Sequence, residues 1–125
     1  MLILASASPR RRDLLARVGV PFAVSPADVD ESVHPGEDPI AYVERVASTK
    51  ADAHSTTDDW VLAADTTVVL AGAIFGKADD ADHAATMLRA LRGRTHQVIT
   101  AVVLRRGAAH HRITVTSDVE LCGFD

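Results

Sequence analysis

The sequence predicts an α/β domain, on two observations. Short apolar runs rich in β-branched residues alternate with segments whose apolar residues recur at helical spacing. Turns marked by glycine or proline separate these segments. The chain has 125 residues, the size of one domain or less than one, and its 47% apolar and 24% charged residues are ordinary for a folded protein. We therefore expect residues 1–125 to form a single α/β unit.

The N-terminal part predicts a strand, a helix and a second strand. An apolar run over residues 2–5 indicates a buried strand. A helix over residues 9–18 follows, because Ser8 is a typical N-cap and proline is tolerated at the first helical position. Gly19 ends this helix, and residues 22–24 are expected to form a short strand.

The first turn of this helix carries an unusual charge. Arg10, Arg11 and Arg12 lie at its positive end, where acidic residues are preferred. Cations there repel the helix dipole unless an anion lies among them, so the turn could bind phosphate. The alternative is a solvated basic turn, and the local sequence favours neither.

An acidic, turn-rich loop precedes the second helix. We expect the loop, residues 28–38, to lie on the same side as the arginine turn. Asp38 caps the helix and Pro39 opens it, and the helix is expected to run to about His54.

The second helix places a lysine on its apolar stripe. The stripe consists of Ile40, Val43 and Ala47, with Val46 beside it, and Lys50 is the next position. A lysine there either snorkels to solvent near the helix end, the more common case, or meets an anion.

The strongest strand pattern covers residues 60–70. It predicts a central strand covered on both faces, and Asp65 interrupts it. A buried carboxylate is costly unless it pairs with cations or a metal, which favours a functional role over a helix-capping or backbone-bonding one.

Four further segments complete the chain. Residues 73–75 pair back after a turn, and Gly76 and Lys77 follow them. A third helix is capped by Asp79 or Asp80, has the stripe Ala81, Ala84, Leu88 and Leu91, and stops at Gly93. Residues 95–105 and 111–121 form a hairpin.

Composition excludes several classes of protein. A net charge of −4 argues against a broad nucleic-acid surface. Cys122 is the only cysteine, which excludes a disulfide framework within the chain, and the histidines do not form a metal set. The apolar runs are too short to cross a membrane and no signal-peptide pattern is present, so the cytoplasm is the expected location.

The candidate residues together suit a polyphosphate and a divalent metal. Arg10, Arg11, Lys50 and Lys77 supply positive charge, and the acidic candidates are Glu31 and Asp65. Cations neutralise phosphate oxygens, while carboxylates hold Mg²⁺ or Mn²⁺ and one of them can activate water. The set therefore favours phosphoanhydride hydrolysis over acyl transfer, which needs a serine or cysteine nucleophile.

Several short motifs occur in order along the chain. They are residues 4–11, Glu31, residues 42–51, 63–66 and 76–77, and residues 87–100. The ordered set resembles the Maf family over nearly the whole chain. The resemblance implies a mixed β-sheet flanked by helices, similar to the inosine triphosphate pyrophosphatases, with a cleft between two lobes.

The resemblance also implies an activity. Members of the family are nucleoside triphosphate pyrophosphatases that use Mg²⁺ or Mn²⁺ to release a monophosphate and pyrophosphate. They are house-cleaning enzymes first named for effects on septum formation, and a homodimer is expected, with no nucleic-acid or membrane partner.

Site residues follow from the same resemblance. Asp65 corresponds to the catalytic carboxylate that activates water and binds metal, and Glu31 to the second acidic residue at the metal. The substrate contacts correspond to Ser8, Arg10, Arg11, Lys50 and Lys77. Arg10 and Thr66 match the branch that acts on dTTP and UTP; the 7-methyl-GTP branch tends to have Tyr and Gln there.

Three departures from the family pattern stand out. Ala78 replaces the usual proline, and Ala71–Gly72 replaces Asp-Gly in the preceding turn. Family members also continue past the hairpin into a Lys-Ala-Gly-x-Tyr segment that lines the cleft. We expect the sequence to match about the first two-thirds of the family fold, as a fragment or a natural truncation, and the hairpin to expose apolar surface. The alternative function is nucleotide binding or septum regulation with impaired catalysis.

Overall fold

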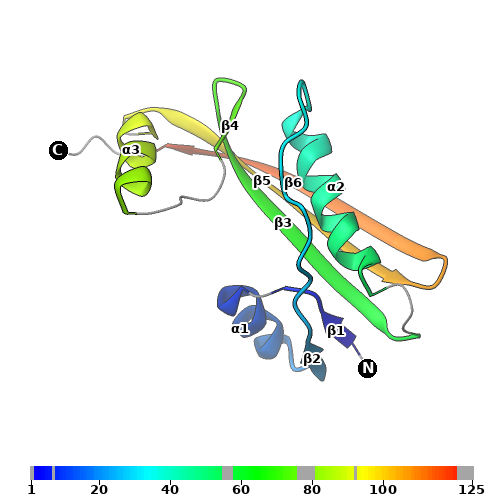
Figure 1. Ribbon diagram of the computed structural model, residues 1–125. Coiled ribbons are helices and arrows are strands. Elements are labelled where there is room, and N and C mark those ends of the chain that lie inside the picture. Colours follow the sequence, from blue (N-terminus) through cyan, green and yellow to red (C-terminus); the bar gives the residue numbers. More distant parts are fainter. Residues whose placement is uncertain (1, 7, 55–57, 76–80, 92, 121–125) are drawn as a thin grey trace.

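The computed structural model describes residues 2–6, 8–54, 58–75, 81–91 and 93–120 and confirms the α/β class. In chain order the elements are β1 (Leu2–Leu4), α1 (Pro9–Val18), β2 (Phe22–Val24), α2 (Pro39–Asp52), β3 (Trp60–Leu70), β4 (Ala73–Phe75), α3 (Ala81–Leu91), β5 (Thr95–Arg106) and β6 (Ala109–Glu120). Figure 1 shows the long strands β3, β5 and β6 crossing the molecule, with the helices beside them.

One mixed sheet contains all the strands of the described part, in the order β2-β1-β3-β5-β6, with β4 pairing β3. β1 runs parallel to β2 and β3, while β3 pairs antiparallel with β4 and β5. β1 reaches only residues 60–62 of β3, and β4 reaches only residues 68–70. The β3 edge between them, residues 63–67, therefore has no strand partner among the described residues, and Asp65 lies in this open stretch.

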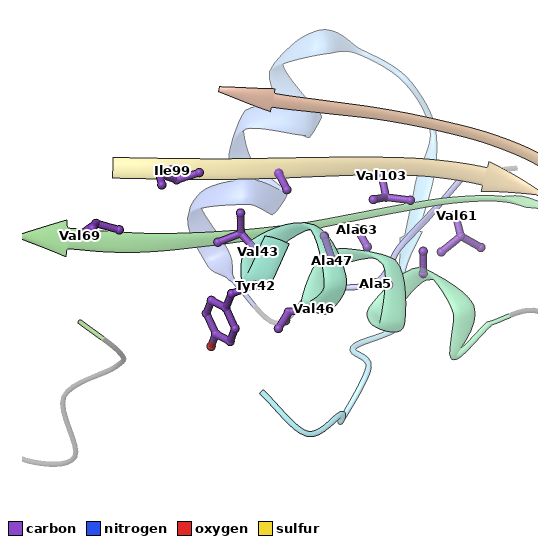
Figure 2. Packing of buried hydrophobic residues seen from close by; sticks show 12 residues of the cluster. Ala5, Tyr42, Val43, Val46, Ala47, Val61, Ala63, Val69, Ile99 and Val103 are labelled. Atoms are coloured by element: carbon purple, nitrogen blue, oxygen red, sulfur yellow. The ribbon is translucent and has the colours of Figure 1, made fainter. Parts of the chain in front are cut away.

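The core lies between α2 and one face of the sheet. Val43, Val46 and Ala47 of α2 are fully buried, as are Ala63 of β3 and Val103 of β5. Side chains alternate across a strand, so this face also carries Asp65, and the opposite face carries Ala64 and Thr66. Figure 2 shows this packing and the Tyr42 ring projecting from α2 on the side away from Ile99.

Two expectations about α2 need correction. Ile40 is 41% exposed, whereas Tyr42 is buried, so the buried stripe begins two residues later than the pattern predicted. Ile40 lies in the first turn of α2, directly after the N-cap Asp38 and Pro39. The helix ends at Asp52 rather than near His54.

The opposite face of the sheet is only partly covered. α1 lies beside it but buries none of its residues. Because α1 stands off the sheet, a groove of about 740 Å³ opens between them, which we call the α1 groove. Its lining includes Arg10, Arg11, Leu15, Leu62, Thr66 and Thr100. The expectation that β3 is covered on both faces is therefore wrong over this stretch.

The C-terminal elements follow the predicted order. β5 and β6 form the predicted hairpin, with β5 ending one residue later and β6 beginning two residues earlier than expected. In α3, Leu91 is buried as expected, but Ala81 is exposed because it opens the helix. The predicted caps Asp79 and Asp80 lie outside the described residues. No helix in the described part is both long and apolar enough to cross a membrane.

Candidate active site

The buried lysine joins two carboxylates. Lys50 lies in the last turn of α2 and is 8% exposed. Its Nζ lies 3.2 Å from Glu31 Oε1 and 3.4 Å from Asp65 Oδ1. Of the two readings of this lysine, the structure supports the one in which it meets anions. The ammonium links a residue of the acidic loop to the open stretch of β3.

Asp65 is buried on the face of β3 that α2 covers. Burial raises the pKa of its carboxyl group, the Lys50 ammonium opposes this, and the Glu31 carboxylate adds to the rise. Asp65 Oδ1 accepts the hydrogen bond from Lys50, and Oδ2 accepts none from the described residues. A carboxylate whose pKa is raised, and whose Oδ2 accepts no hydrogen bond within the described part of the chain, is suited to accept a proton from water.

Glu31 reaches the site from a loop without helix or strand structure. Its side chain is 35% exposed, so it lies at the mouth of the site while Asp65 lies deeper. The Tyr42 hydroxyl donates a 2.6 Å hydrogen bond to the Glu31 carbonyl. Burial, together with the nearby Asp65 and Glu31 carboxylates, raises the pKa of Tyr42. The hydroxyl therefore stays protonated and remains a donor.

The arginine turn lies on the other side of β3. The Ser8 hydroxyl accepts from the Arg11 N–H as the N-cap of α1, and Pro9 occupies the first turn, as predicted. Arg11 donates to the Ala64 carbonyl at 3.3 Å and to Thr66 Oγ1 at 3.0 Å. Both acceptors flank Asp65, and the Arg11 charge opposes the rise in the pKa of Asp65.

The three arginines of this turn differ in their surroundings. Arg10 and Arg12 are exposed, and neither makes a hydrogen bond or ion pair through its side chain with the described residues. Arg11 is half-buried and uses three of its five N–H donors in hydrogen bonds to the Ser6 hydroxyl, the Ala64 carbonyl and the Thr66 hydroxyl. Arg11 is thus fixed in place with further N–H donors unused among the described residues, where the exposed Arg10 side chain has no partner.

The acidic loop and the arginine turn do not share one surface. The Glu31–Lys50–Asp65 cluster faces α2, and Arg10 and Arg11 line the α1 groove on the opposite face of β3. Both groups adjoin residues 64–66 of β3, where Arg11 donates to Ala64 and Thr66 and Lys50 pairs with Asp65. Lys77 lies outside the described residues.

The cluster fits a magnesium-like ion in one respect. Mg²⁺ in phosphate-processing sites is held by one or two carboxylates together with substrate phosphates. The contacts among the described residues use Glu31 Oε1 and Asp65 Oδ1, and within that part of the chain Glu31 Oε2 and Asp65 Oδ2 accept no hydrogen bond and could face a cation. The described residues contain no group of three or more His, Cys, Asp or Glu that could hold a metal by themselves. The substrate would have to supply the other ligands.

The sequence predicts no role for Ser6 or Tyr42, which the site uses, and it marks Thr66 only as a match to the dTTP/UTP branch. Ser6 is buried and accepts from the Ser8 N–H and from Arg11 Nη1. Thr66 Oγ1 lies 3.0 Å from Thr100 Oγ1, because the two residues pair across β3 and β5. Tyr42 precedes Lys50 by eight residues, so helical spacing alone could have placed both on one stripe.

Comparison with known proteins gives a family match and close relatives. The family model described as Maf-like protein matches residues 1–124. A dTTP/UTP pyrophosphatase of Anaeromyxobacter dehalogenans is 57% identical over 108 residues, which cover 86% of this chain and 55% of that protein. A dTTP/UTP pyrophosphatase of Methylococcus capsulatus is 52% identical over 121 residues, covering 94% of this chain and 60% of that protein. The chain thus spans little more than half the length of these relatives.

Solved structures support the fold. The Ham1 protein of Staphylococcus aureus superposes with a TM-score of 0.67 at 17% identity, covering 95% of this chain and 70% of that one. A HAM1 protein from Coxiella burnetii gives a TM-score of 0.61 at 16% identity. At this level of identity the likeness concerns architecture alone, and it confirms the mixed sheet flanked by helices.

Proposed function

We propose that this chain, which belongs to the Maf-like protein family, carries the catalytic carboxylate and phosphate-binding turn of a nucleoside triphosphate pyrophosphatase acting on dTTP and UTP. The observation that carries the proposal is the buried Asp65, held by Lys50 beside Glu31 at the open edge of β3. The relatives named dTTP/UTP pyrophosphatase supply the substrate. We also propose that residues 1–125 form one Maf-like unit.

The proposed reaction assigns each charged residue a task. Water attacks the α-phosphorus, the bond from that phosphorus to the bridging oxygen breaks, and pyrophosphate leaves with the monophosphate as the other product. Asp65 accepts the proton of the attacking water at a carboxylate oxygen, which its raised pKa favours. Lys50 keeps Asp65 oriented and limits the rise of its pKa.

Phosphate binding falls to the arginine turn. Arg10 and Arg11 line the α1 groove at the N-terminus of α1, and neither uses all its N–H donors within the described part of the chain, so both can neutralise phosphate oxygens. Ser8 holds the turn as the N-cap of α1. Ser8, Lys50 and Lys77 are proposed as further substrate contacts on the family resemblance alone.

The proposed site also includes a divalent cation. Mg²⁺ or Mn²⁺ would be held by Glu31 and Asp65, and when bound it neutralises the charge that develops on the phosphate oxygens. We further propose a cytoplasmic protein that acts on free nucleotides, without a nucleic-acid or membrane partner, and that forms a homodimer.

Product analysis tests the proposal. The full chain is incubated with dTTP and Mg²⁺, and the products are separated by ion-exchange chromatography. dTMP and pyrophosphate are expected, whereas dTDP and orthophosphate would contradict the reaction type. Turnover of 7-methyl-GTP in preference to dTTP would contradict the substrate assignment.

The matched variant is Asp65→Asn. It keeps the shape of the side chain but removes the proton acceptor, so turnover should fall by about a hundredfold or more. If Asp65→Asn kept the turnover of the wild-type chain, Asp65 would not be the proton acceptor. Stabilisation of the chain by dTTP without any product would favour the alternative of binding without catalysis.

A further inference from the structure

Glu31 lies in a loop that has no regular structure of its own. Residues 25–38 form neither helix nor strand, apart from a turn at residues 35–36. A carboxylate on such a loop is not fixed by a ladder of backbone hydrogen bonds. Its position near Lys50 must therefore come from contacts between the loop and the elements around it.

Two successive backbone carbonyls of the loop accept hydrogen bonds from α2. The Tyr42 hydroxyl donates to the Glu31 carbonyl at 2.6 Å, and Arg45 Nη2 donates to the Ser32 carbonyl at 2.7 Å. Tyr42 and Arg45 are three residues apart, so they lie next to each other on the helix surface. The Arg45 guanidinium also lies over the Tyr42 ring, 5.6 Å from its centroid.

The loop adds contacts of its own at the same place. Both Glu37 oxygens accept from Arg45, at 2.8 and 3.0 Å, which fixes the guanidinium in a bidentate ion pair. Asp30 accepts from the Ser32 N–H at 2.9 Å, which forms a tight turn beside Glu31. The backbone of Glu31 is thus held from both sides along the chain.

The same helix holds both ends of Glu31. Tyr42 and Lys50 are eight residues apart, which places them on one face of α2 with about 12 Å between them along the axis. Tyr42 binds the backbone of Glu31, and Lys50 binds its carboxylate. We propose that Tyr42 and Arg45 are positioning residues that hold Glu31 at the site, an inference that rests on the proposed function for its catalytic consequence.

Tyr42→Phe isolates the effect, because it removes one hydroxyl and keeps the buried ring. The hydrolysis of dTTP with Mn²⁺ is measured for the wild-type chain, Y42F, E31Q and the double variant. Y42F should lower kcat/KM by about tenfold in the wild-type background, as expected for one lost hydrogen bond. In the E31Q background it should have almost no effect, because Tyr42 acts through Glu31. An equal loss in both backgrounds would overturn the proposal.

Thr49→Val is the matched control. Thr49 lies on the same helix and donates to the Arg45 carbonyl at 2.8 Å, a bond within α2 that does not reach the loop. T49V should keep kcat/KM within about twofold of wild type, as is usual for substitutions away from special features. Arg45→Lys keeps the charge but cannot bind Ser32 and Glu37 together, and it should resemble Y42F.

A second measurement does not depend on turnover. Hydrogen–deuterium exchange over residues 29–34 should speed up by about tenfold in Y42F and R45K, and not in T49V. Unchanged exchange in Y42F would overturn the positioning role. If the wild-type chain hydrolyses no nucleotide, the proposed function fails, and loop exchange still decides whether Tyr42 and Arg45 hold Glu31.

Discussion

At the scale of single residues, Lys50 is the point on which the site depends. Its ammonium compensates two carboxylates, and one of them, Asp65, is buried. A buried charge without a partner is costly, so removing the cation or a buried carboxylate alone would destabilise the folded protein. This explains why a lysine occupies a position where helical spacing calls for an apolar side chain.

Lys50→Met tests this dependence, because methionine fills a similar volume without charge. The variant should lose about 3 kcal/mol of stability at pH 7, the usual cost of breaking a buried pair. Burial raises the pKa of the Asp65 carboxyl group above its usual value of 3.8. The folded state therefore holds the proton more tightly than the unfolded state. The stability that this proton contributes is fully present below pH 3.8 and is lost as the pH rises through the pKa of Asp65 in the folded protein. Without the Lys50 ammonium the pKa of Asp65 rises further, so the variant loses more stability between pH 3.8 and pH 7.

Urea denaturation of wild type and K50M at several pH values measures this difference. The gap in unfolding free energy should be small near pH 3.8 and should widen toward pH 7. A gap that stays constant with pH would mean that Lys50 contributes through packing of its methylene chain rather than through its charge.

At the scale of elements, α1 depends on its ends more than on its packing. None of its residues is buried, and Leu14 and Val18 are 55% and 70% exposed. What holds the helix is the Ser8 cap at one end and Gly19 in the left-handed conformation, with φ of 83°, at the other. The two bonds that Arg11 makes to β3 tie this helix to the sheet.

Ser8→Ala should therefore act locally. Loss of the cap costs about 1 kcal/mol, so amide exchange over residues 10–16 should speed up by about fivefold while β3 and β5 keep their protection. Ser8→Thr is the matched control, because it retains a capping hydroxyl. Faster exchange throughout the sheet would show that α1 is part of the cooperative core.

The elements were largely predictable from the sequence, and their contacts were not. The pattern of residues 60–70 predicts a strand with the same bounds as β3, because a long run rich in β-branched residues fits few other structures. The N-cap residues Ser8 and Asp38, each followed by a proline, likewise predict where α1 and α2 begin, because capping depends only on neighbouring residues. By contrast, the exposure of Ile40 and the burial of Tyr42 depend on where α2 crosses the sheet. Local spacing does not contain that information.

The candidate site shows the same division. The burial of Asp65 and the anion contact of Lys50 were among the readings that sequence spacing offered, since each places a charge among apolar neighbours. Residue type makes Glu31 an acidic candidate, and the family resemblance gives it a place at the metal. That it completes the set depends on the course of an irregular loop. The separation of Arg11 from Asp65 by β3 follows from strand alternation, which becomes informative only once Arg11 is known to reach Thr66.

At the scale of the whole molecule, the two faces of the sheet are unequal. α2 covers β3 and β5 on one face, while apolar side chains of β6 on the other face remain open to solvent, among them Ile113 at 67% and Val115 at 55% exposure. These residues pair with Val102 and Thr100 of β5, so they continue the wall that borders the α1 groove. The expectation that the hairpin exposes apolar surface is thus confirmed.

This surface predicts self-association of the chain, because contiguous apolar patches favour contact with other surfaces. Replacing Ile113 and Val115 together by threonine keeps β-branched side chains, so the hairpin should persist while the patch becomes polar. Light scattering at rising concentration should show less association for the double variant, with lower binding of an apolar dye. Replacing Thr114 and Thr116 by serine on the other face of β6 is the control. If both pairs reduce association equally, the β6 edge, whose backbone groups are shared by both faces, is the contact rather than the apolar face.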